Sequence, residues 1–190
     1  MKMPNGYKET QEYGNYRVLP PGGYVCVIKN VAEHTASSGK EMLKVSLDIA
    51  EGDYRGYFMD QYQMRRLTAD DASTVKWSND GTKYVSVLDR NGSCSRDFKT
   101  FCACLEDQGI KVWSDSKELM MDNLRNQIIG VTFGREENEW NGKRTWHTKP
   151  KYFVRVDDIH SGNFSVPADK PLASEPAFEP YAATSDDLPF

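Results

Sequence analysis

The sequence predicts a mainly β domain with inserted helices, followed by an acidic and disordered C-terminal tail. Short stretches of alternating apolar and polar residues, typical of half-buried strands, recur along the first 160 residues, and turn residues separate them. Five of the nine prolines lie in residues 161–190, where few apolar side chains remain to offset the entropy of ordering the chain. We therefore divide the 190 residues into a folded domain at 1–160 and a flexible tail at 161–190.

The first three predicted strands follow one another closely. Residues 24–31 are rich in Val and Ile and come after a Pro-Pro-Gly-Gly breaker. Residues 42–51 predict a second strand, because apolar and polar side chains alternate from Leu43 to Ile49, and the polar loop at 35–40 predicts that these two strands form a hairpin. Residues 54–62 are rich in aromatic side chains and predict a third strand, with a bulge or bend at Gly56.

A helical region is predicted in the middle of the chain. Residues 95–108 carry apolar side chains at helical spacing, begin at the candidate N-cap Ser95 and end before Gly109. Residues 116–126 predict a second helix. Residues 68–93 contain two turn signals and a short apolar alternation, and their pattern favours no single element.

Two further alternating stretches predict a closing hairpin at 127–136 and 143–156, because the dipeptide Asn-Gly lies between them. Pro150 predicts an edge position or a break in the second of these strands. Three strands, a helical region and two strands follow the order of the OB-fold, a five-stranded Greek-key barrel. On this order we predict a mainly β fold class, an OB-fold-like barrel with inserted helices. Several small barrels and α+β folds share the same order of elements.

The charge balance first argues against a polyanionic partner. The chain holds 24 Lys and Arg against 28 Asp and Glu, a net charge of −4, whereas proteins that neutralise phosphates usually carry an excess of bases. Residues 161–190, however, contain five acids and one base. The whole negative excess therefore belongs to the tail, and the domain is free to present a basic groove.

Other features narrow the class of protein. The chain has no apolar run of about 18 residues and no apolar stretch behind a basic start, so we expect a cytoplasmic protein without membrane contact. The four cysteines form no Cys-x-x-Cys pair, and the three histidines lack the spacing of metal ligands. We therefore expect structural thiols and no cofactor.

The last five residues form a compact hook of one aromatic ring, one proline and two carboxylates, suited to an apolar pocket with a basic rim. This ending resembles the C-terminal tip of bacterial and phage single-stranded DNA-binding proteins, with Leu188 where Ile is usual. The resemblance implies an OB-fold, a linker and a tip that recruits replication and recombination proteins in a bacterial host cell. The linker here has only one glycine, Gly162, so its composition departs from the family. The tip comprises Asp186, Asp187, Leu188, Pro189 and Phe190.

A second resemblance covers residues 17–160. Three short motifs there are similar to those of a group of phage-encoded proteins from replication or recombination modules. The two resemblances together imply a phage or prophage protein that binds single-stranded DNA. The motifs are Gly22-Gly23-Tyr24, Ser38-Gly39-Lys40 and Leu47-Asp48-Ile49.

Binding of a single strand needs aromatic faces for base stacking and Lys or Arg along the backbone. Three clusters offer both, and the tip of the closing hairpin is the best candidate because tip residues have the least core to serve. The predicted DNA contacts are Trp140, Lys143, Arg144, Trp146, Lys149 and Lys151 in the closing hairpin, Tyr57, Tyr62, Arg65 and Arg66 along and after the third strand, Trp77 in the unassigned loop, and Lys44 on the second strand.

Two rival functions stay open at this point. One is a protein–protein adaptor of a replication or recombination module with no DNA affinity. The other is a small metal-dependent nuclease that uses Asp48, Glu51 and Asp53 around a turn. No other pattern predicts an enzyme, and the sequence leaves homo-oligomerisation open.

Overall fold

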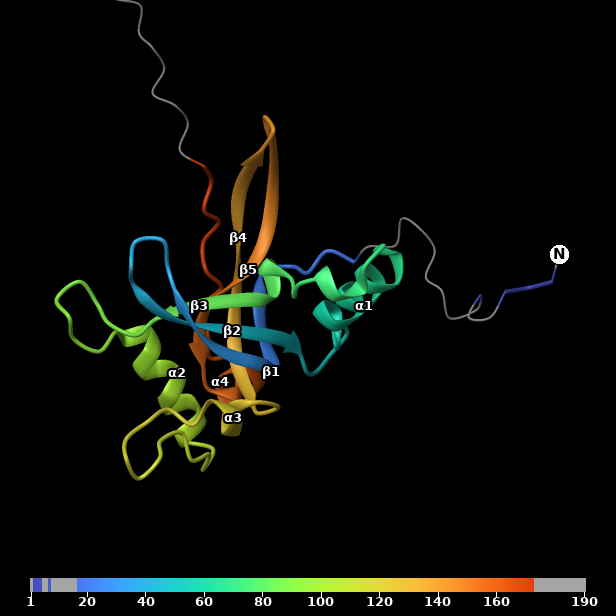
Figure 1. Ribbon diagram of the computed structural model, residues 1–190. Coiled ribbons are helices and arrows are strands. Elements are labelled where there is room, and N and C mark those ends of the chain that lie inside the picture. Colours follow the sequence, from blue (N-terminus) through green and yellow to red (C-terminus); the bar gives the residue numbers. More distant parts are fainter. Residues whose placement is uncertain (1, 5–6, 8–16, 173–190) are drawn as a thin grey trace, which may run out of the picture.

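The computed structural model describes residues 2–4, 7 and 17–172. Five strands form one sheet, and helices lie around it (Figure 1). All four pairs of neighbouring strands are antiparallel, in the order β3-β2-β1-β4-β5. The mainly β prediction is confirmed. The predicted hook at 186–190 lies outside the described residues. The strands are β1 (Gly22–Thr35), β2 (Glu41–Ile49), β3 (Thr82–Ser86), β4 (Ile128–Trp140) and β5 (Lys143–Val154).

Both predicted hairpins form. β1 pairs with β2 from Cys26↔Ile49 to Thr35↔Glu41. β4 and β5 meet at Asn141 and Gly142, whose φ values of 50° and 72° are those of a two-residue hairpin turn with a left-handed backbone. Their register shifts beside Pro150, which lies in an edge strand as predicted.

The predicted third strand at 54–62 is wrong, because these residues lead into helix α1 (Tyr57–Thr68). Gly56 reverses the chain with a left-handed φ of 78°, and the buried carboxylate of Asp48 accepts the N–H of Phe58 at 2.9 Å. Aromatic side chains favour strands, but these tertiary contacts decide for the helix. The third strand of the sheet is β3, from the stretch in which the pattern favoured no element, and it pairs with β2 through Lys44↔Tyr84.

The main predicted helix is confirmed as α2 (Arg96–Glu106), whose N-cap Ser95 accepts the N–H of Phe98 at 3.1 Å. The second predicted helix shrinks to α3 (Met121–Leu124). A turn at Lys117, with φ of 63°, replaces its first part. The sequence pattern did not predict the remaining helical elements, which are the 3-10 turns η1 (Ala72–Thr74) and η2 (Asn79–Gly81) and the helix α4 (Val156–Ser161).

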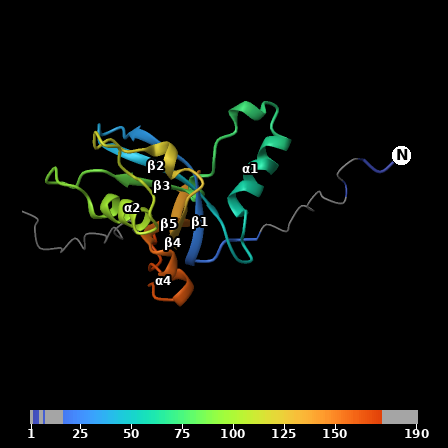
Figure 2. The same cartoon turned by 90° about the horizontal axis from the view of Figure 1, so that it is seen from below.

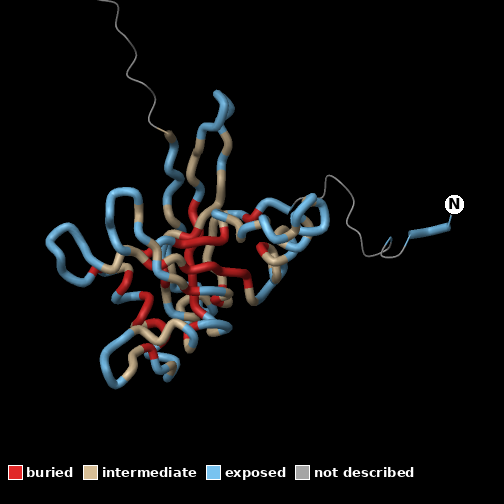
Figure 3. Tube along the Cα trace, in the orientation of Figure 1, coloured by how far each residue is buried: buried red, intermediate tan, exposed pale blue. Residues whose placement is uncertain are grey.

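The core lies between one face of the sheet and helices that cap it from different sides. Figure 3 shows the buried residues gathered at the centre of the strands, with the tip of the β4–β5 hairpin exposed. Phe58 of α1 stacks on Phe133 at 6.1 Å between ring centroids, and Phe101 of α2 packs on Phe153 at 4.9 Å. Seen from below, α1 lies toward one end of the strands and α2 toward the other, and α4 is at the lower end of the view (Figure 2).

The sheet stays open between β3 and β5, which form no ladder, but polar side chains link its two edge strands. Lys83 of β3 is almost fully buried, donates to the carbonyl of Lys151 at 2.7 Å and pairs with Asp97 of α2 at 2.8 Å. A second link joins Asp80 of η2 to His147 of β5 at 2.9 Å. These contacts hold the two edges together where main-chain hydrogen bonds are lacking.

The chain continues to pack on the sheet after the predicted domain end at residue 160, which falls inside α4. We call residues 163–172 the strap, and in Figure 1 they run beside the β4–β5 hairpin. The ring of Phe164 lies over Gly23, Pro167 lies over Gly134, and Lys170 forms a parallel bridge to Glu136. In the described part of the chain, no helix has the length and apolar character to cross a membrane.

Candidate nucleic-acid interface

The β4–β5 hairpin projects beyond the sheet because β1 begins at Gly22, opposite Phe133. Its last seven residue pairs therefore have no β1 neighbour, and their side chains alternate between two faces. On one face Trp146 lies opposite Glu137, and on the other Trp140 lies opposite Lys143. The predicted hairpin cluster is therefore split between two faces.

Three aromatic side chains of the hairpin are open to solvent. Trp140 is 78% exposed, Tyr152 61% and Trp146 45%. Side chains of this size usually bury most of their surface, so a group of exposed rings indicates a surface that binds a partner. Each ring can stack on a nucleobase, which is a sequence-tolerant contact.

The cations predicted in the hairpin differ in how far they are neutralised. Arg144 pairs with Glu139 at 3.1 Å, and Lys151 pairs with Glu136 at 2.9 Å, where its hydrogen bond lowers the pKa of that glutamate. Lys143 and Lys149 form no ion pair with any residue that the structure describes. The acids of β4 thus reduce the free positive charge of the hairpin.

Arg135 joins this site, although the sequence did not single it out. Its guanidinium carbon lies 5.5 Å from the centroid of the Trp146 ring, within the range of a cation–π contact. The same guanidinium forms a two-pronged ion pair with Asp169 of the strap, which lowers the pKa of the aspartate and raises that of the arginine. Only the β4–β5 register places Arg135 beside Trp146.

The structure brings together two clusters that the sequence kept apart. The rings of Tyr62 on α1 and Trp77 lie 5.5 Å apart, and Arg66 covers Tyr62 at 5.8 Å from its ring centroid. Trp77, a predicted DNA contact, is half-buried and donates its indole N–H to the carbonyl of Gly81 at 3.2 Å. Arg65 is exposed on the same helix.

This α1 cluster is connected to the hairpin through η2. Asp80, next to Gly81, contacts Nδ1 of His147 on β5, while Nε2 of the same ring lies 3.0 Å from the hydroxyl of Thr145. Tyr57, a predicted DNA contact, is half-buried and packs against the core. Its ring packs edge-on against Phe58, and its hydroxyl accepts the backbone N–H of Leu19 at 3.3 Å.

The outer face of the first three strands forms another aromatic and basic spot. Lys44 lies 6.0 Å from the ring centroid of Tyr84, whose other neighbour is the ring of His34 at 5.0 Å. The sequence missed His34 and Tyr84 because their adjacency depends on the β1–β2–β3 register. The outer face of β1 and β4 is instead covered, since Ile159 of α4 lies over Gly23 and Gly130.

The three carboxylates of the rival nuclease prediction do not converge. Asp48 is buried and accepts three backbone N–H groups, from Ile49, Phe58 and Met59, while its burial raises its pKa. Glu51 contacts His160 at 2.9 Å. Among the residues that the structure describes, no group of three or more His, Cys, Asp or Glu side chains is placed to hold a metal ion.

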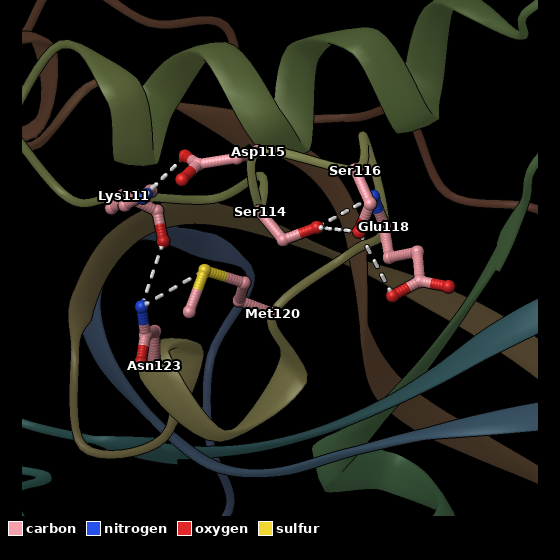
Figure 4. Close-up of polar contacts among 7 residues, drawn as sticks. All are labelled: Lys111, Ser114, Asp115, Ser116, Glu118, Met120 and Asn123. Atoms are coloured by element: carbon pink, nitrogen blue, oxygen red, sulfur yellow. Dashed lines mark hydrogen bonds and ion pairs between the residues drawn. The ribbon is translucent and has the colours of Figure 1, made fainter.

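The loop between α2 and β4 is polar, but its groups satisfy one another (Figure 4). Lys111 pairs with Asp115 at 2.9 Å, and the amide nitrogen of Asn123 donates to the carbonyl of Lys111 at 3.0 Å. This loop lies at the opposite end of the molecule from the hairpin tip (Figure 1). It contributes no free cation or ring to the interface.

The chain matches a known family over most of its length. Residues 6–146 match the family described as "Protein of unknown function (DUF669)", which is well over half of the chain. The matched range includes the hairpin tip and Trp146 and ends before the strap. A search of curated proteins finds no match.

Proposed function

The chain therefore belongs to the DUF669 family, and we propose that it is a non-catalytic protein that binds single-stranded DNA. One observation carries the proposal: the projecting hairpin holds two tryptophans open to solvent, Trp140 opposite Lys143 on one face and Trp146 beside Arg135 on the other. Exposed rings next to cations are what a sequence-independent single-strand site needs. The resemblance of the last five residues to the tip of single-stranded DNA-binding proteins adds a proposed role, recruitment of replication or recombination proteins.

The strand arrangement supports an OB-fold interpretation of the domain. β1 lies between β2 and β4, α2 joins β3 to β4, and Lys83 links the two edge strands. An OB-fold barrel is partly open, and it binds oligonucleotides on strands two and three and on its β1–β2 and β4–β5 loops. In this chain those elements carry Lys44, Tyr84 and the hairpin tip.

The test is a titration of the full chain with oligo-dT, followed by the fluorescence of its four tryptophans. We expect Trp140→Ala with Lys143→Ala to weaken binding about tenfold or more, since one stacked base contributes about 1–3 kcal/mol. The matched control, Leu88→Ala with Arg90→Ala, removes an exposed apolar side chain and a cation from the turn before α2. Equal loss in both variants, or no binding by the wild-type chain, would refute the proposal.

A second candidate function is that of a protein–protein adaptor, because acids already pair with several hairpin cations. Arg135, Arg144 and Lys151 each have a carboxylate partner. An adaptor would give no fluorescence change with oligo-dT at any salt concentration. DNA binding would instead show a linear fall of log affinity with log salt, with a slope of about −0.7 per phosphate contacted.

A further inference from the structure

The strap completes the edge of β4 that β1 leaves free. The N–H of Lys170 donates to the carbonyl of Arg135 at 3.0 Å, and the N–H of Glu137 donates back to the carbonyl of Lys170 at 2.9 Å. The N–H of Leu172 donates to the carboxylate of Glu137 at 3.1 Å. Unpaired edges invite pairing with other chains, so this edge is closed by the protein's own C-terminal segment.

Two apolar contacts hold the strap against the sheet. A methyl group at Gly23 would lie 2.5 Å from the ring of Phe164, and one at Gly134 would lie 2.8 Å from Pro167. The absence of a side chain at Gly23 and Gly134 therefore leaves room for Phe164 and Pro167, and a larger residue at either glycine would displace the strap side chain. These contacts anchor the first part of the strap, and the bridge between Lys170 and Glu136 anchors its second part.

The strap also determines where one cation of the candidate interface lies. The carboxylate of Asp169 accepts two hydrogen bonds from the Arg135 guanidinium in a bidentate ion pair, and that guanidinium lies over the ring of Trp146. A two-pronged ion pair fixes the plane of a guanidinium as well as its position. Trp146 is still 45% exposed, so the ring keeps open surface for a base.

We propose that the strap is part of the DNA-binding surface and that Asp169 is a positioning residue, which holds Arg135 against Trp146. The inference rests on the proposed function and deepens it. In this arrangement Arg135 orients the Trp146 ring, and the ring surface it leaves open stacks on a base. The binding unit then ends near residue 172, and the tail begins there.

Whether one substitution raises or lowers the DNA affinity separates this positioning role from a simple charge effect. Replacing an acid beside a DNA site by its amide removes repulsion of phosphate and should tighten binding. If Asp169 positions Arg135, Asp169→Asn weakens binding instead, because the amide cannot form the two-pronged ion pair. Asp157→Asn is the matched control, since its exposed side chain forms no ion pair in the described part of the chain.

The experiment measures affinity of the full chain for oligo-dT and amide hydrogen exchange of Glu137 and Lys170 without DNA. We expect Asp169→Asn to weaken binding about fivefold and to speed exchange at both amides. Asp157→Asn should bind as tightly as the wild-type chain or more tightly, and Asp169→Glu should recover part of the loss. In a Trp146→Ala background, Asp169→Asn should cause no further loss of affinity, because the loss acts through the Trp146 ring and only the removal of repulsion remains.

Two results would overturn the inference, and they differ from each other. If the wild-type chain binds oligo-dT and Asp169→Asn binds equally or more tightly, the strap does not position the site although the proposed function stands. If the wild-type chain does not bind, the proposed function fails with the inference. The exchange measurement in free protein then still reports whether Asp169 secures the strap.

Discussion

Asp48 shows how a single buried side chain determines an element that the local pattern misrepresents. Its carboxylate accepts the N–H groups of Ile49 and Phe58 at 3.0 and 2.9 Å and so supports the first turn of α1. Burial raises the pKa of Asp48, while the same N–H groups act to lower it. The acceptor stabilises the helix start, and the buried charge opposes folding.

The two effects are separated by Asp48→Asn and Asp48→Ala. Alanine leaves buried N–H groups without an acceptor and should lower the free energy of unfolding by about 1–3 kcal/mol at pH 7, whereas asparagine keeps an acceptor and should cost less. Because the pKa is raised on folding, wild-type stability should fall as pH rises from about 3.9 through the folded pKa. Urea denaturation at pH 4 and pH 7 measures both, and Asp48→Asn should flatten this dependence. Equal losses for the two variants would contradict the account.

Lys83 is the other buried charged residue with a distinct task, since it joins β3, α2 and β5. Lys83→Met keeps the aliphatic stem but removes the donor to the Lys151 carbonyl and the partner of Asp97. Because the Asp97 carboxylate is 33% exposed, we expect a loss of about 1–3 kcal/mol rather than the larger penalty of a fully buried pair. Lys99→Met, at a lysine 70% exposed, should change unfolding by no more than about 0.5 kcal/mol. Similar urea midpoints for both variants would count against the role of Lys83 in joining the two edge strands.

At the scale of elements, α1 is the helix whose packing depends on one ring. Phe58 is fully buried, stacks on Phe133 and lies under Gly81. Phe58→Ala should therefore cost about 3–5 kcal/mol of unfolding free energy. Leu67→Ala, on the same helix but 82% exposed, should be almost neutral. Thermal or urea unfolding of the two variants checks this, and a small effect at Phe58 would show that α1 does not seal the core.

The hairpins and α2 could be predicted because their signals are local. Asn-Gly between alternating stretches determines the β4–β5 turn, and Ser95 with a helical apolar spacing determines α2. The helix α1 could not be predicted, because its start depends on Asp48, a residue of the preceding strand. β3 could not be predicted either, since a five-residue strand depends on its partner for definition.

The candidate site was predictable in its composition but not in its assembly. Exposed Trp140 and Trp146 follow from their place near a hairpin tip. The neutralised state of Arg144 and Lys151 and the inclusion of Arg135 require the register of β4 against β5. Predicting the strap requires knowing that β4 has a free edge, and this edge exists only because β1 begins opposite Phe133.

At the scale of the whole molecule, the strap changes where the charge boundary lies. Residues 1–172 contain 24 acids and 24 bases, and the other four acids lie in residues 173–190 with no base. Asp169 and Lys170, formally of opposite charge, both contact β4, through Arg135 and Glu136. The net charge of −4 therefore begins directly after a segment anchored beside the hairpin.

This placement predicts how the tail tunes DNA affinity. Changing the four terminal acids to amides in the full chain should tighten oligo-dT binding at low salt, because a charge of −4 attached beside the hairpin repels phosphate. The effect should disappear at high salt, since the screening length falls from about 30 Å at 0.01 M to about 3 Å at 1 M. Fluorescence titrations at both salt concentrations measure the difference, and equal affinities of the two chains at low salt would show that the tail charge does not reach the site. The acids are Glu175, Glu179, Asp186 and Asp187.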